Sequence, residues 1–244
     1  MAAFRFLTII PLPSSFGCDS DDLAAATVFF PLVGVFLGFV AGCGAWLFWQ
    51  ILPPPVAAVV LIFLLLSFSG ALHLDGLADS ADGFFSSRDR AGILKIMRDS
   101  RVGAMGVVAL ITVLMLKFAS LSGFNQIEAM KVSFLMPVAG RCTLAIMMTL
   151  LPYIRPEGGL GTLFYSRQTG FAAMLSVIVL FVLSFLVQGV PGLGLASLVM
   201  LTVLLFSLFS FRKIGGATGD VLGAGCEISE TTMVLYFVVL PAIW

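Results

Sequence analysis

The sequence contains few charged residues, and this scarcity indicates its class. Lys, Arg, Asp and Glu make up 11% of the 244 residues, while 60% are hydrophobic, whereas soluble domains carry roughly 25% charged residues. A soluble core cannot bury this much apolar surface, so the composition predicts an integral membrane protein. The length predicts one membrane-embedded domain over residues 1–244, with no room for a second, soluble domain.

Other absences exclude several kinds of site. The formal net charge is zero, so bulk charge does not attract nucleic acid, and we expect no nucleic-acid partner. Cys18, Cys43, Cys142 and Cys226 have no close spacing of the zinc or redox kind. No Gly-Lys-Ser/Thr ending of a Walker loop is found. The one histidine, His73, could be a general base, contact a phosphate, or simply lie at the end of a span.

Long apolar runs predict an all-α, polytopic membrane protein with about seven transmembrane helices. The last run is short, so it could span only in part. The predicted spans are 26–49, 54–72, 103–123, 132–151, 171–188, 192–211 and 231–244.

The basic residues of the connecting segments predict the orientation. With seven spans, the segments 1–25, 73–102, 152–170 and 212–230 share one face. That face carries ten Lys or Arg residues against Lys131 alone on the other, which predicts that it is cytoplasmic. The ten are Arg5, Arg88, Arg90, Lys95, Arg98, Arg101, Arg155, Arg167, Arg212 and Lys213. Lys117 and Arg141 fall inside predicted spans, where both could snorkel or Arg141 could face the bundle interior.

Three acids with helical spacing follow the second predicted span. Asp75, Asp79 and Asp82 stand at i, i+4 and i+7, on one face of a helix that should continue directly from that span. Carboxylates stacked in this way repel each other unless a cation lies among them. Oxygen ligands without a Cys or His cluster favour Mg²⁺ and similar hard ions. The alternative is a solvated helix face, which explains three acids in register less well.

Two further segments supply candidate phosphate ligands. Arg98 and Arg101 are three residues apart and suited to bidentate phosphate contacts, although anchoring at the membrane surface is the alternative. Asp99 between them could ligate metal or hold the arginines. The stretch 215–230 is glycine-rich, and we expect a loop whose Gly215, Gly216 and Gly219 amides face phosphate. Its acids Asp220, Glu227 and Glu230 would lie on the cytoplasmic face, and Asp220 could bind metal or take a proton.

These segments together resemble a known family. Leu72-His73-Leu74-Asp75-Gly76-Leu77-Ala78-Asp79-Ser80-Ala81-Asp82-Gly83 is similar to the defining motif of cobalamin synthases, also called adenosylcobinamide-GDP ribazoletransferases. Arg5-Phe6-Leu7-Thr8, Met97-Arg98-Asp99-Ser100-Arg101-Val102-Gly103 and Gly215-Gly216-Ala217-Thr218-Gly219-Asp220 resemble its other motifs. Ser80 stands where many members have Thr. The resemblance covers the whole chain in order.

The resemblance implies a Mg²⁺-dependent enzyme of the bacterial cytoplasmic (inner) membrane, with its amino terminus and active-site loops in the cytoplasm. A hydroxyl of α-ribazole or of its 5′-phosphate would attack adenosylcobinamide-GDP and release GMP. Asp75, Asp79, Asp82 and Asp99 would then hold metal, Arg98 and Arg101 phosphate, and Asp82, Asp220 or His73 would act as base. A homo-oligomer is compatible with the sequence.

Two other functions fit parts of the pattern. CDP-alcohol phosphotransferases also displace a nucleoside monophosphate, but Asp79 stands where their motif has Arg. An ion-coupled transporter would place ion ligands near the bilayer midplane, whereas the predicted spans hold almost no charge.

Overall fold

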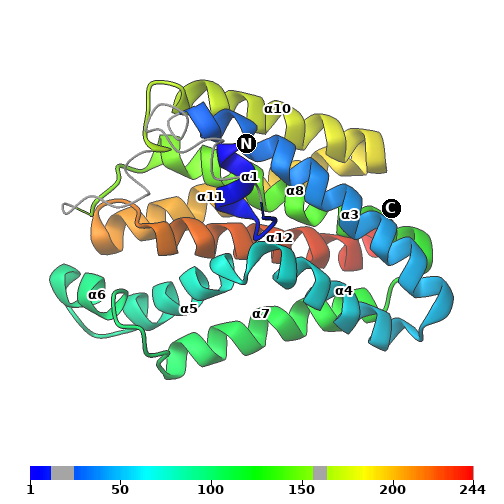
Figure 1. Ribbon diagram of the computed structural model, residues 1–244, viewed down its shortest axis with the longest axis horizontal. Helices are drawn as coiled ribbons and strands as arrows, with labels where there is room; N and C mark the ends of the chain where they lie inside the picture. The colour runs from blue at the N-terminus through cyan, green and yellow to red at the C-terminus, as the bar shows by residue number, and fades with distance from the viewer. Residues whose placement is uncertain (12–24, 156–163, 244) are drawn as a thin grey trace.

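The computed structural model describes residues 1–11, 25–155 and 164–243, and every regular element in these ranges is a helix (Figure 1). Six helices are long and apolar enough to cross a membrane, and a bent pair makes seven if it counts as one span. The predicted all-α polytopic architecture is therefore confirmed. In chain order the helices are α1 (Ala2–Leu7), η1 (Thr27–Phe29), α3 (Phe30–Ile51), α4 (Pro54–Ser69), α5 (Leu72–Phe84), α6 (Arg90–Ile96), α7 (Ala104–Ser122), α8 (Gln126–Leu150), α10 (Thr169–Gln188), α11 (Val190–Ile214) and α12 (Gly219–Ile243).

Five predicted spans correspond to helices: η1 with α3, α7, α8, α10 and α11. The largest shift among their boundaries is at α8, which begins six residues before the predicted 132. A capping box sets this start, because the Asn125 side chain accepts from the amides of Ile127 and Glu128 while the Glu128 carboxylate accepts from the Asn125 amide. The polar residues of this predicted loop therefore begin a helix.

The second predicted span is broken, which corrects the expectation of a continuous helix. α4 ends at Ser69 and α5 begins at Leu72, and their axes differ by 90°. The break is made by Gly70 and Ala71, whose φ values of 59° and 57° are left-handed, a conformation that ends a helix and is uncommon for Ala. The Ile9 amide donates to the Phe68 carbonyl at 2.8 Å beside the break. The acidic helix α5 thus turns back onto the bundle and packs against α7 and α12.

The last span also differs from its prediction. α12 begins at Gly219, twelve residues before the predicted 231, so most of the glycine-rich stretch is helical rather than a loop. Small residues let α12 approach α5 closely. A Cβ on Gly76 would lie only 2.7 Å from the Asp220 carbonyl oxygen. The prediction failed because glycine and acidic residues lower the hydropathy of a segment that is buried inside the bundle.

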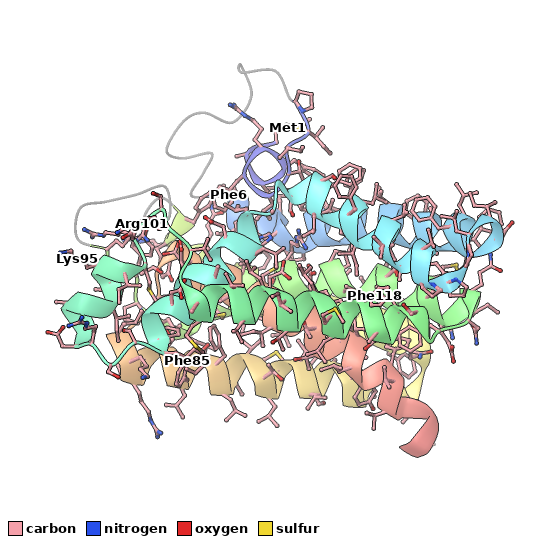
Figure 2. The ribbon with its side chains drawn as sticks, turned by 90° about the horizontal axis from the view of Figure 1, so that it is seen from below. Met1, Phe6, Phe85, Lys95, Arg101 and Phe118 are labelled. Carbon is pink, nitrogen blue, oxygen red and sulfur yellow. The ribbon has the colours of Figure 1, made fainter. Side chains whose placement is uncertain are left out.

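The bundle is built around α8, which is the most buried of the candidate spans and contacts α3, α10 and α12. The outer helices expose large apolar side chains, such as Ile111 of α7 and Leu205 of α11, as lipid-facing surfaces do. Polar connections gather at one end: Lys95 and Arg101 lie there, whereas Phe118 lies along the bundle's length (Figure 2). That this end faces the cytoplasm stays a prediction.

Candidate active site

Acidic residues of α5 and α12 meet where these two helices cross. The charges of Asp220, Asp75 and Asp82 all act on Asp79, and the charge of Asp75 also acts on Asp220. Asp220 lies in the first turn of α12, and its Oδ2 accepts from Arg155 Nη2 at 2.6 Å and from Thr218 Oγ1 at 3.2 Å. The fold therefore brings Asp75, Asp79 and Asp220 together, three of the acids that the sequence offered as site candidates, although Asp220 lies far from the other two in the chain.

A cavity of about 290 Å³ opens beside this acidic group. Its polar lining comes from His73, Asp75, Arg155 and Asp220, and Arg155 is the only Lys or Arg among the described lining residues. The rest of the lining is apolar side chains, glycine and one tyrosine: Phe6, Leu72, Gly76, Leu144, Met148, Tyr153, Phe164, Gly219, Leu222 and Gly223. The cavity thus joins a charged side to an aromatic side.

Arg155 was missed as a site residue, because the sequence shows it only as one of ten basic residues in connecting segments. Its position depends on a long-range backbone contact: the Ile154 amide donates to the Ala217 carbonyl at 3.1 Å, and the Ala217 amide to the Pro152 carbonyl at 2.9 Å. This contact ties the segment after α8 to the start of α12. It places the Arg155 guanidinium against Asp220, a contact that no spacing within either segment could indicate.

The three glycines predicted to contact phosphate have different surroundings. Gly215 has a φ of 80° and ends α11 in the left-handed conformation. Gly216 is packed against Pro152, whose carbonyl oxygen would lie 2.3 Å from an added Cβ. Only Gly219 lines the cavity, and nothing lies within 4 Å of the place where its Cβ would be. Of the three glycines, the described structure thus places Gly219 at the cavity, and phosphate binding by any of them stays a prediction.

Asp82 has a different environment from Asp75 and Asp79. Its Oδ2 accepts from the Gly103 amide at 2.7 Å and its Oδ1 from the Gly106 amide at 2.8 Å. These amides belong to the cap and first turn of α7, where backbone N–H groups lack helical partners. A Cβ at either glycine would collide with the Asp82 carboxylate. Both oxygens of Asp82 are thus engaged in joining α5 to α7.

Asp99 and Arg101 form an ion pair at the surface. Arg101 Nη2 lies 2.7 Å from Asp99 Oδ2, and the Arg101 side chain is 86% exposed. Side-chain hydrogen bonds from Arg101, followed by its backbone amide, lower the pKa of Asp99 to about 2. Arg98 is also exposed. None of the three lines the cavity, so the structure does not bring them together with Asp75 and Asp220.

His73 is buried, with only 3% of its surface exposed. It lines the cavity, and its Nε2 has no hydrogen-bond partner among the described residues. The charges of Arg141, Glu230 and Lys117 act on it from the other side. His73 therefore lies between the cavity and a second group of charged residues.

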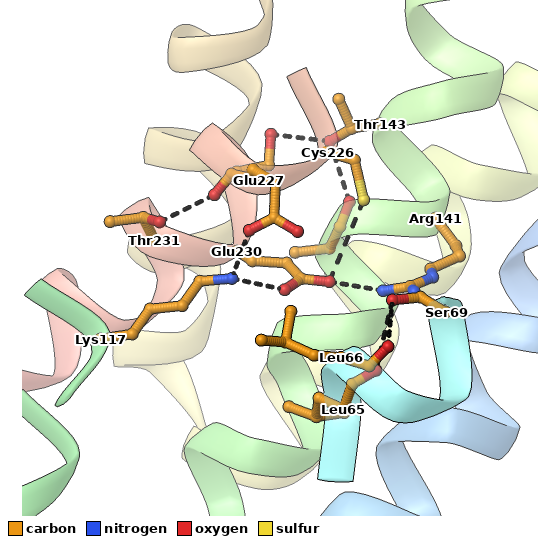
Figure 3. Close-up of polar contacts among 12 residues, drawn as sticks. Leu65, Leu66, Ser69, Lys117, Arg141, Thr143, Cys226, Glu227, Glu230 and Thr231 are labelled. Atoms are coloured by element: carbon orange, nitrogen blue, oxygen red, sulfur yellow. Dashed lines mark hydrogen bonds and ion pairs between the residues drawn. The ribbon is translucent and has the colours of Figure 1, made fainter. Parts of the chain in front are cut away.

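This second group is a buried ion-pair network inside the bundle (Figure 3). Lys117 Nζ lies 2.7 Å from Glu227 Oε2 and 2.8 Å from Glu230 Oε2, and Glu230 Oε1 pairs with Arg141. All four residues are at most 5% exposed. The expectation that Glu227 and Glu230 lie on the cytoplasmic face is therefore wrong. Their partners come from α7 and α8, so Lys117 and Arg141 face the interior and do not snorkel.

The carboxylates at the cavity fit a magnesium ion that is shared with a phosphate ligand. Among the described residues, no three His, Cys, Asp or Glu side chains form a ready-made metal cage. Mg²⁺, however, commonly takes one or two protein carboxylates and completes its shell with waters and substrate phosphates. Asp75 faces the cavity one helical turn from Asp79, which supplies such an incomplete set of oxygen donors.

The chain is similar over almost its whole length to proteins of one family. The family model described as cobalamin-5-phosphate synthase matches residues 1–238. Curated relatives named adenosylcobinamide-GDP ribazoletransferase include those of Acetivibrio thermocellus, 38% identical over 95% of this chain and 94% of the relative, and Geotalea daltonii, 38% identical over 98% and 96%. The relative of Desulforamulus reducens is 37% identical over 95% and 92%. No solved structure matches. Given this full-length match, the chain belongs to the cobalamin-5-phosphate synthase family.

Proposed function

We propose that this protein is an adenosylcobinamide-GDP ribazoletransferase, which completes the nucleotide loop of cobalamin. The full-length relationship to proteins of that name supports the proposal. The structural observation that carries it is the cavity where Asp75, Asp220 and Arg155 meet an aromatic wall. A diphosphate and an aromatic nucleoside are the two chemical groups that such a cavity can serve.

Asp75 and Asp79 are the proposed ligands of Mg²⁺, bound together with the substrate diphosphate. When bound, the ion neutralises negative charge that develops on the phosphate oxygens during transfer. Asp79 experiences the charges of Asp75, Asp82 and Asp220, so this group of like charges favours a cation. Asp82 and Asp99 stay predictions as ligands, because each carboxylate already accepts hydrogen bonds from protein groups.

Asp220 is the proposed general base. The acceptor hydroxyl gives its proton to the Asp220 carboxylate as the hydroxyl oxygen bonds to the phosphorus attached to the corrinoid arm. The bond from that phosphorus to the bridging oxygen then breaks, and GMP leaves with the electron pair. Arg155 holds the Asp220 carboxylate at 2.6 Å and thus fixes the base at the cavity. Asp82 is less accessible for this role, because both of its oxygens accept hydrogen bonds from backbone amides. The neighbouring His73 forms part of the cavity wall.

The phosphate of the departing GMP also needs positive charge. Arg155 is the described cation that lines the cavity, and Gly219, which also lines it, lies at the start of α12, where a helix favours anions. Arg98 and Arg101 stay predictions for phosphate binding, since neither lines the cavity. The proposed setting is the bacterial inner membrane, with the end of the bundle that bears Lys95 and Arg101 in the cytoplasm.

The distribution of charged residues in the fold bears on the two alternative functions. An ion-coupled transporter is no longer opposed by charge-free spans, since four ionisable groups are buried in the bundle. Two of these are cations and two are anions, however, and they pair with each other, so they offer no uncompensated site for a transported ion. A CDP-alcohol phosphotransferase would share the metal chemistry and differ in its substrate.

The test is GMP release by the purified protein in detergent. The protein is incubated with adenosylcobinamide-GDP and α-ribazole 5′-phosphate, with Mg²⁺ or with a chelator, and products are separated by chromatography. We expect Mg²⁺-dependent GMP together with a cobalamin product. Asp79→Asn should abolish most of this release, whereas Asp89→Asn, the same change at the exposed cap of α6, should not. CMP release from a CDP-lipid, without GMP release, would contradict the assignment.

A further inference from the structure

The cavity is too small for all of the proposed substrates at once. Its volume of about 290 Å³ is at the lower end of the range of ligand pockets, about 300–1,000 Å³. A corrin macrocycle with its side chains cannot enter a space of this size. One bicyclic aromatic base with its sugar can. The question is therefore which base the cavity holds, that of the acceptor nucleoside or the guanine of the GDP group.

The apolar side of the cavity is built from aromatic rings on separate segments. Phe6 of α1 and Phe164, which precedes α10, have ring centroids 4.4 Å apart. Tyr153 adds a third ring and packs against Tyr165 at 5.3 Å. Phe164 is fully buried, so it supports the Phe6 ring from behind, whereas Phe6 and Tyr153 are partly exposed at the cavity. Because α1 lies across the bundle near the break between α4 and α5 (Figure 1), Phe6 reaches the cavity only through this long-range packing.

The polarity of this wall discriminates between the two bases. Guanine carries N–H donors and a carbonyl on its edge, and burial without partners would cost each of these groups its hydrogen bond to water. The aromatic and aliphatic lining has no Asn, Gln, Ser or Thr among the described residues, and its one hydroxyl, that of Tyr153, lies near Arg155 and Asp220. The base of α-ribazole is a dimethylated benzimidazole, whose outer edge carries two methyl groups. Methyl groups against Leu144, Met148 and Leu222 are stabilised by burial.

We propose that the cavity binds the acceptor nucleoside, with its benzimidazole base against Phe6 and Tyr153, while the corrin ring and the guanine stay outside. This inference rests on the proposed function. It places the ribose beside Asp220 and Asp75, because these carboxylates form the polar side of the same cavity. The hydroxyl that attacks phosphorus is then held within reach of the proposed base. Phe6 and Tyr153 determine specificity for the acceptor.

The experiment measures the KM for each of the two substrates with the wild-type protein and with the Phe6→Leu and Tyr153→Leu variants. Loss of one aromatic contact should raise the KM for α-ribazole 5′-phosphate by about twofold to tenfold, with the KM for adenosylcobinamide-GDP unchanged. Phe63→Leu is the matched control, because Phe63 on α4 is 70% exposed and does not line the cavity. Binding of α-ribazole 5′-phosphate alone, measured by titration calorimetry, should weaken by the same factor.

A second arm changes the ligand instead of the protein. An acceptor with unsubstituted benzimidazole lacks two methyl groups, so wild-type binding should weaken about tenfold if both are buried. A rise in the KM for adenosylcobinamide-GDP alone would overturn the proposal and assign the cavity to guanine. Unchanged values for both substrates would also overturn it. If the wild type binds α-ribazole 5′-phosphate but releases no GMP, the proposed function fails and the acceptor site stands.

Discussion

Two groups of charged residues lie close together in this fold, and they differ in net charge. The buried network has two cations, Lys117 and Arg141, and two anions, Glu227 and Glu230. The cavity group has Asp75 and Asp220, which line the cavity with Arg155 as the one described lining cation, and the neighbouring Asp79, on which both carboxylates act. The first group is therefore neutral by itself. The second retains excess negative charge beside a cavity.

This difference indicates which group is structural and which is functional. Buried charges are tolerated when they are paired and hydrogen-bonded, and the network meets that condition inside the bundle. Like charges at a cavity are unfavourable until a cation or a proton arrives. The network thus holds α7, α8 and α12 together, whereas the cavity group awaits a metal ion and substrate. The predictions below change one group and measure whether the other responds.

The largest effect is expected from Glu230→Gln, which unbalances the network. Glu230 pairs with both Lys117 and Arg141, so its loss leaves excess positive charge in the bundle. Removing one partner of a buried pair costs about 3–5 kcal/mol. The free energy of unfolding should fall by about that much, measured by thermal unfolding in detergent. The double variant Arg141→Met with Glu230→Gln removes one charge of each sign and should recover part of the loss. Equal loss in both variants would contradict the charge-balance argument.

Asp79→Asn should lower activity rather than stability. Asp79 is repelled by Asp75, Asp82 and Asp220, so removing its charge should leave the unfolding temperature unchanged or higher in the absence of metal. Activity should fall by about a hundredfold or more, since a lost metal ligand removes stabilisation of the transferred phosphoryl group. The measurements are GMP release at saturating substrate and thermal unfolding with and without Mg²⁺. A fall in stability equal to that of Glu230→Gln would place Asp79 with the structural group.

The sequence was sufficient to predict a membrane protein and five of its spans, because an apolar run long enough to cross a bilayer can be recognised within a single segment. It was also sufficient to predict that Asp75 and Asp79 share one face of a helix, because they lie one helical turn apart. The break after Ser69 was not predictable in this way. It depends on Ala71 in a left-handed conformation and on the hydrogen bond from Ile9 to Phe68, which join segments about 60 residues apart.

The prediction of a loop at the start of α12 failed for a related reason. A hydropathy window counts Glu227 and Glu230 as costly in a membrane, which favoured a surface loop over residues 215–230. Their true cost depends on Lys117 and Arg141, which lie more than 80 residues earlier in the chain. Arg155 was undervalued for the same reason, because its partner Asp220 is 65 residues away. Long-range pairing determines burial of charge, and no single segment contains that information.

Asp82→Asn should have a moderate effect on stability. Asp82 accepts from two amides at the start of α7, and Asn keeps one acceptor oxygen while its amide group opposes the other N–H. Loss of a helix cap costs about 1 kcal/mol, which thermal unfolding can resolve. Activity should fall less than in Asp79→Asn. An equally large loss of activity with unchanged stability would instead support Asp82 as a ligand or base.

The smallest effect is expected at the exposed pair. Asp99 and Arg101 contact each other at the surface and do not line the cavity, and exposed ion pairs contribute little to stability because water screens them. Asp99→Asn should therefore leave both the unfolding temperature and the Mg²⁺ dependence of GMP release nearly unchanged. Arg101→Lys, which keeps the charge but loses the fork of donors, should alter the KM for adenosylcobinamide-GDP less than twofold. If either variant instead shifts the Mg²⁺ concentration needed for half-maximal rate, the segment after α6 closes over the cavity when substrate binds, and the acidic group includes Asp99 in that state.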